Sequence, residues 1–135
     1  MKKIISSGFI AGIILFVLSY GGLFISIRFF PALFTDYNNP LFNSDGSRDI
    51  FFYLHAFVFS FALSWFWSRF KELFKGSFII RGVEIGLVYA MVALLPAMWI
   101  TFSSLDITLL MVSSWFLYGF LQAIVAGLVF AKINP

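Results

Sequence analysis

Hydrophobic positions along the chain fall into four long runs that contain no charged residue. The runs are Ile4–Ile27, Ile50–Ser68, Ile85–Leu105 and Ile107–Ala131. About 20 helical residues span the ~30 Å of a bilayer's hydrocarbon core, so each run is long enough to cross it. The pattern predicts four transmembrane helices over about residues 4–28, 48–70, 78–102 and 105–132. A loop over about 29–47 joins the first two.

Composition agrees with this pattern, since 61% of the 135 residues are hydrophobic and only 11% are charged. The four runs use most of the chain, so we expect one transmembrane domain over residues 1–135, an all-α polytopic four-helix bundle in contact with the lipid bilayer. The first run extends to Ile27, past the ~7–15-residue core of a signal peptide, so we expect a retained first helix.

The basic residues are distributed unequally between the two sides of the predicted bundle. Four crossings place both termini on one side. Of the nine Lys and Arg, seven share that side, namely Lys2, Lys3, Arg69, Lys71, Lys75, Arg81 and Lys132, and only Arg28 and Arg48 lie opposite. The positive-inside rule then predicts cytoplasmic termini and, for a bacterial chain, the plasma (inner) membrane. The basic residues form no stripe with interleaved aromatics, so we expect no nucleic-acid partner.

Small residues recur at helical spacing in every predicted helix, and in lipid such residues let helices approach closely. The glycines expected to pack against other helices are Gly8, Gly12, Gly82, Gly86, Gly119 and Gly127. We interpret the stripes as meeting inside one bundle, and the alternative is that one stripe receives a partner subunit. Gly8-xxx-Gly12 and Gly82-xxx-Gly86 also occupy matching positions, which suggests two parallel helical-hairpin repeats or a chance likeness.

Polar side chains inside a membrane are candidates for function because their burial is costly. Four such residues stand out: Glu84, Arg81, His55 and Gln122. We expect Arg81 to pair with Glu84 at the membrane edge, His55 to be a hydrogen-bonded packing residue bonding the outer loop or Tyr53, and Gln122 to bond between helices. The alternative is that Glu84, His55 and Gln122 face one wet cavity and relay protons. With one His and no Cys, no catalytic, metal or cofactor site is predicted.

Two local signals concern the last two helices. Pro96 lies inside the third run and should distort that helix. Ser103 and Asp106 have the spacing of a capping box for the fourth helix.

Several of these features together resemble small four-span inner-membrane proteins of bacteria. They are Lys2-Lys3, the two GxxxG pairs, Pro96 and the run Trp115–Gly127 with Gln122 within it. This type has no established activity to transfer, so the resemblance implies a fold and no catalytic residue.

Two functions remain open from the sequence. The first is a non-enzymatic protein that acts by association, as an accessory subunit of another membrane protein or as a homo-oligomer. The alternative is a small transporter or channel for an ion or small molecule. Whether Gln122, Glu84 and Tyr118 line a cavity or only pack would distinguish them.

Overall fold

The fold is all-α, with four helices long and apolar enough to cross a membrane among the residues described. This computed structural model describes residues 1–42 and 45–135; Asn43 and Ser44 of the predicted loop lie outside them. The elements are α1 (Lys2–Phe29), the 3₁₀ helix η1 (Pro31–Asn38), α2 (Asp49–Phe70), the 3₁₀ turn η2 (Lys71–Leu73), α3 (Phe78–Tyr89), the π-helical turn η3 (Ala90–Leu94), α4 (Leu95–Ser104) and α5 (Leu109–Ile133). Together α3, η3 and α4 form one span.

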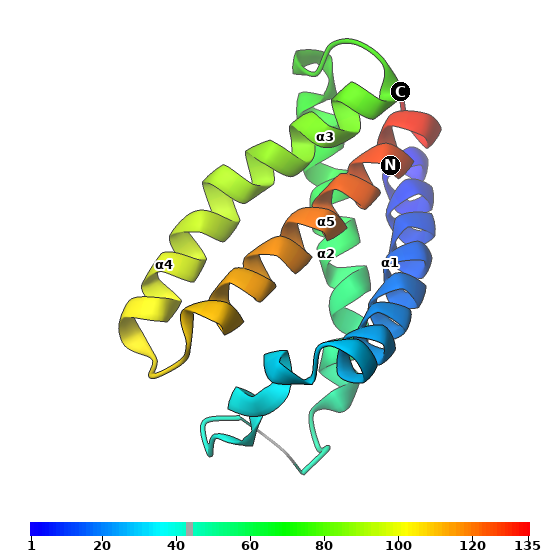
Figure 1. Cartoon of the computed structure of the whole chain (residues 1–135). Coiled ribbons are helices and arrows are strands. Elements are labelled where there is room, and N and C mark those ends of the chain that lie inside the picture. The colour runs from blue at the N-terminus through cyan, green and yellow to red at the C-terminus, as the bar shows by residue number, and fades with distance from the viewer. Residues whose placement is uncertain (43–44) are drawn as a thin grey trace.

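The spans form two hairpins that meet along α5 (Figure 1). In one hairpin α1 lies against α2, and in the other α3 lies against α5, while α1 and α2 both contact α5. The N- and C-termini lie together at one end, here called the termini end, and η1 lies at the opposite, loop end (Figure 1). Toward the loop end α4 points away from α1 and α2 and packs mainly against α5 and η3.

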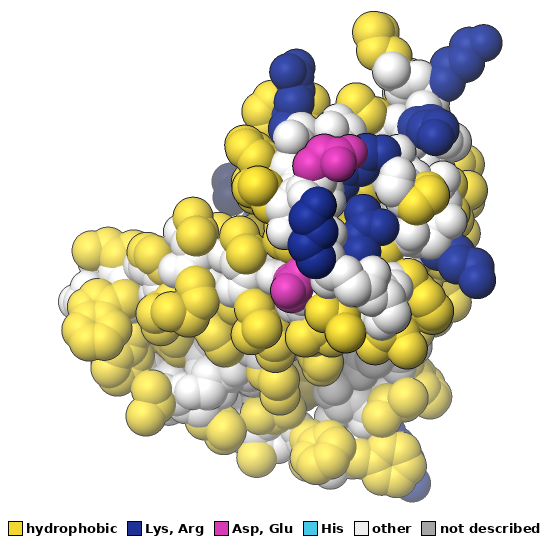
Figure 2. Space-filling model, turned by 90° about the horizontal axis from the view of Figure 1, so that it is seen from above, with side chains coloured by type: hydrophobic (Ala, Val, Ile, Leu, Met, Phe, Trp, Pro, Cys, Tyr) yellow, Lys and Arg dark blue, Asp and Glu magenta, His cyan; other side chains and the backbone are white. Residues whose placement is uncertain are grey.

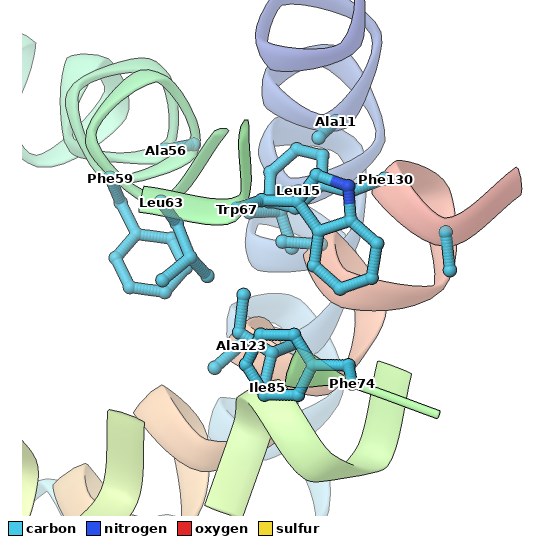
Figure 3. Close-up of a cluster of buried hydrophobic side chains, with 12 residues drawn as sticks. Ala11, Leu15, Ala56, Phe59, Leu63, Trp67, Phe74, Ile85, Ala123 and Phe130 are labelled. Atoms are coloured by element: carbon cyan, nitrogen blue, oxygen red, sulfur yellow. The ribbon is translucent and has the colours of Figure 1, made fainter. Parts of the chain in front are cut away.

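The core lies toward the termini end, where all four spans converge (Figure 3). Trp67 is fully buried, stacks on Phe74 with centroids 5.5 Å apart, and lies near Phe130 and Leu63. Figure 2, which looks onto the termini end, shows Lys and Arg gathered around this end of the molecule. An apolar core therefore lies beneath a charged surface that faces the membrane edge.

Glycines allow close contact within both hairpins, in the same register. A Cβ built at each first-helix glycine would lie on a side chain of the second helix: Gly8 at 2.7 Å from Phe61, Gly12 at 2.6 Å from Phe57, Gly82 at 2.7 Å from Leu128 and Gly86 at 2.5 Å from Ile124. In each hairpin a step of four along the first helix matches a step of four back along the second. This shared register agrees with the predicted repeat. A polar contact also joins α1 to α2, since the hydroxyls of Ser7 and Ser64 lie 2.8 Å apart.

The distortion expected at Pro96 takes the form of the π-helical turn η3, directly before the proline. Leu95 donates its backbone N–H to Ala90 O, five residues back instead of four. A π turn takes in one more residue than an α turn. It therefore changes which residues of this span face the protein: Leu94 at the end of η3 is buried, whereas Ala97 in α4 is exposed.

The cap predicted for the last helix was wrong. The N-cap of α5 is Thr108, whose Oγ1 accepts a hydrogen bond from Met111 N at 3.2 Å. Ser103 remains in α4, where its hydroxyl donates to Ile100 O. The turn after Ser104 is longer than predicted, so the cap lies five residues later along the chain.

Candidate functional site

A cavity of about 630 Å³ lies between α1 and α5 toward the loop end, with η1 over it and Phe52 of α2 beside it. Ligand sites in proteins commonly measure ~300–1,000 Å³ and combine apolar walls with a few convergent polar groups. The walls here are largely leucine and aromatic side chains. Besides the Tyr37 hydroxyl and the Trp115 indole N–H, the polar groups are those of Ser19, Ser26, Ser114, Tyr118 and Gln122. Among the described residues, no Asp, Glu, Lys, Arg or His lines the cavity.

Three of these polar side chains form one hydrogen-bonded cluster on the cavity wall. The Tyr118 hydroxyl donates to Ser19 Oγ at 2.5 Å. Gln122 Nε2 donates to Tyr118 OH at 2.9 Å and to Ser19 Oγ at 3.2 Å. Tyr118 and Gln122 are one turn apart on α5, so both side chains face the same way. The cluster joins α5 to α1 and leaves a polar spot in an otherwise apolar wall.

The cover of the cavity is η1, which lies in the loop predicted over about residues 29–47. Trp115 Nε1 on α5 donates to the Tyr37 hydroxyl on η1 at 2.7 Å. Phe42 lies against both rings, with centroids 4.9 Å from Tyr37 and 6.2 Å from Trp115. The loop is therefore attached to α5 across the opening between the hairpins.

The cavity exists because the small-residue stripe of α1 changes its use along the helix. Gly8 and Gly12 are covered by α2, but a Cβ at Gly22 would meet no atom within 4 Å. Gly22 and Ser26 instead line the cavity. The stripe thus serves as a packing surface near the termini end and as a cavity wall near the loop end.

Gln122 and Glu84 line two different hollows and His55 lines neither, which argues against the alternative of a relay through these three residues. Gln122 is 6% exposed and bonds between helices, as expected of it, and it also lines the cavity. Glu84 lines a separate groove between α2 and α3. His55 is exposed and stacks on Phe59 one turn away. The expected hydrogen bond of His55 to the loop or Tyr53 is wrong for the described chain, because its ring lies along its own helix.

The expected pairing of Arg81 with Glu84 was also wrong. The Arg81 guanidinium lies 4.9 Å above the Trp67 ring, and Nη2 donates to Lys71 O at 3.5 Å. Arg81 Nε and Glu84 Oε2 are both buried and, within the described residues, have no hydrogen-bond partner. An indole face attracts a guanidinium, and Trp67 draws Arg81 toward α2 and away from its helical neighbour.

Gln122 could be identified from the sequence as a candidate site residue, but its hydrogen-bond partners Ser19 and Tyr118 could not. Ser19 has the helical spacing of the small residues of α1, which by itself predicts helix packing, and the environment of Tyr118 enters the sequence analysis only as a way to distinguish the two functions. The usable signal was the i, i+4 spacing of Tyr118 and Gln122 on a helix otherwise poor in polar groups.

No family model, curated protein or solved structure matches the chain. The likeness to small bacterial membrane proteins therefore extends to four apolar spans and no further.

Proposed function

We propose that this integral membrane protein is non-enzymatic and binds a small, uncharged, largely apolar molecule in the cavity between α1 and α5. The single observation that supports this function is the cluster of Ser19, Tyr118 and Gln122 on the cavity wall. A hydroxyl or carbonyl oxygen on the molecule would exchange hydrogen bonds with this cluster. Its hydrocarbon body would lie along the leucine and aromatic walls.

The lack of charge in the described lining argues for a neutral ligand rather than an ion. An ion in a low-dielectric cavity needs compensating charge or many oxygen ligands. Of the two cargoes considered for a transporter, an ion or a small molecule, the cavity therefore favours a small molecule. Release of the molecule would require η1 to move, because Tyr37 on η1 bonds across to Trp115 on α5.

The association hypothesis has less support. All six predicted packing glycines are buried, and at each of them a Cβ would lie under 3.0 Å from an atom of a neighbouring helix of the same chain. These six glycines are used within the bundle, so the predicted packing glycines are not left over for a partner subunit or a second copy of the chain.

For its location, we propose the plasma (inner) membrane with cytoplasmic termini. The seven basic residues of the termini end, against two at the loop end, support this orientation. With this orientation the cavity lies at the depth of the outer leaflet.

The experiment uses two adjacent glycines as a matched pair. Both Gly21 and Gly22 have space for a side chain, but only Gly22 lines the cavity. Protein purified in mild detergent is extracted with organic solvent, and bound neutral molecules are measured by mass spectrometry. We expect a near-stoichiometric uncharged molecule with wild type and Gly21→Leu, and loss of most of it with Gly22→Leu.

Equal retention by Gly22→Leu and Gly21→Leu would contradict the proposal, as would the absence of any such molecule from wild type. Circular dichroism and gel filtration of both variants show that each retains the fold of wild type. A further variant, Gln122→Leu, should weaken retention while leaving the walls apolar.

A further inference from the structure

A second hollow lies at the termini end between α2 and α3, away from the cavity described above. It is a groove of about 440 Å³ lined by Phe66, Phe70, Phe74, Leu73, Leu87 and Val88, with Glu84 among them. Among the residues that the structure describes, Glu84 is the one charged side chain in this lining. Leu87 and Leu73 are largely exposed, so the groove opens toward the membrane.

The Glu84 carboxylate is uncompensated in this setting. Its Oε2 is buried and accepts no hydrogen bond from any described residue. The nearest cation in sequence, Arg81, is held over Trp67 instead. A carboxylate oxygen shielded from water is stabilised by a hydrogen-bond donor or a cation, and the chain as described supplies neither to Glu84 Oε2.

The other lining residues indicate what kind of partner would fit. Three phenylalanine rings line the same groove as the carboxylate, and aromatic rings attract ammonium groups. Glu84 lies one helical turn deeper than Arg81, about 4.5 Å along the helix, close to the polar edge of the membrane. An ammonium group at this depth would have its hydrocarbon chain within the bilayer, beside Leu87 and Val88.

We propose that this groove binds a membrane phospholipid through its ammonium headgroup, with Glu84 as the partner of the ammonium and an acyl chain along Leu87 and Val88. Basic side chains gather around the termini end (Figure 2), so the phosphate of the same lipid has cations close by. Phosphatidylethanolamine has this chemistry, because its primary ammonium donates three hydrogen bonds next to one phosphate.

The test measures lipid retention by the full chain. Delipidated protein in mild detergent is titrated with phosphatidylethanolamine or with phosphatidylglycerol of the same acyl chains, and bound lipid is counted by native mass spectrometry. Wild type should bind phosphatidylethanolamine about tenfold more tightly than phosphatidylglycerol, the factor that one charge-assisted hydrogen bond of roughly 1.4 kcal/mol represents. Glu84→Gln should abolish that preference.

Two further variants make the result specific. Glu72→Gln removes an exposed carboxylate at the same end and should keep the preference. Leu87→Trp fills the groove while retaining Glu84 and should lower binding of phosphatidylethanolamine, so the proposal stays testable even if Glu84→Gln fails to fold. Equal binding of the two lipids by wild type, or an unchanged preference in Glu84→Gln, would overturn the proposal. Binding of dodecylamine but not of phosphatidylethanolamine would also overturn it, in favour of a lipophilic amine.

Discussion

The Tyr118 hydroxyl donates to Ser19 Oγ at 2.5 Å, and this bond ties the second hairpin to the first at the edge of the cavity. Because Tyr118 also accepts from Gln122, the phenol carries both the contact between helices and the polar spot on the wall.

Replacing this phenol should therefore weaken the bundle. Hydrogen bonds between membrane helices average ~0.6 kcal/mol. Tyr118→Phe removes one such bond, to Ser19, and also the bond from Gln122 within α5, so we expect a loss of about 1 kcal/mol in unfolding free energy. The measurement is reversible unfolding in mixed micelles, followed by circular dichroism. Tyr20→Phe is the control, since Tyr20 is exposed on α1. Equal losses for the two variants would mean that the cluster contributes nothing to stability.

Gly127 should tolerate no side chain. A Cβ there would lie 2.2 Å from Ile85 Cγ2 and 2.7 Å from the backbone oxygen of Gly82, which cannot move independently. Overpacking of this kind costs ~1–3 kcal/mol, so Gly127→Ala should lower stability by about that much. Gly21→Ala should be neutral or stabilising by up to ~1 kcal/mol, because its Cβ meets open space and alanine favours a helix. Thermal unfolding of both variants in one detergent compares them, and a loss at both positions would show that crowding is not the cause.

Trp67 organises the termini end, so we expect Trp67→Phe to be costly. The indole Nε1 donates to Asn134 O at 2.8 Å, and the ring carries the Arg81 guanidinium. Losing a buried hydrogen bond, part of the cation–π contact and ring volume should cost about 2–3 kcal/mol. Trp65→Phe, on a residue that is 54% exposed, should cost well under 1 kcal/mol. Chemical unfolding of the two variants provides the comparison, and similar midpoints would refute the role given to Trp67.

The proposed orientation can be tested by cysteine labelling, because the chain has no cysteine of its own. Leu41 and Lys75 are exposed at opposite ends of the bundle. In intact cells, a membrane-impermeant maleimide should modify Leu41→Cys and spare Lys75→Cys until the membrane is opened. Labelling in the reverse order would place the termini outside.

The spans could be predicted from the sequence because hydrophobic length is a local property. Predicted and observed bounds differ by up to four residues, and the largest difference is at the start of α5, where Thr108 rather than Ser103 is the cap. A capping box requires only two residues at a given spacing, and Ser103 and Asp106 have that spacing without being used as the cap. Which residue becomes the cap depends on where the turn of the hairpin closes.

The site was less predictable because it depends on the angle between hairpins. Hydrophobic pattern does not show that the hairpins separate toward the loop end, so Ser19 and Gly22 look like further members of the packing stripe. The partner of Arg81 was equally hidden, because Trp67 is fourteen positions earlier on another helix. Helical spacing favoured Glu84, and the tertiary contact with Trp67 prevailed.

The π-helical turn at Ala90–Leu94 has a consequence for changes in chain length. An inserted residue in a regular helix rotates everything beyond it by about 100°, and a π turn absorbs one such residue locally. Deleting one residue within this turn should therefore leave Gly82 and Met98 facing the same neighbours as before. The same deletion at Val88 would turn the rest of the span, and Leu94 would no longer meet Gly119. The third span thus tolerates a one-residue deletion at a single place, directly before Pro96.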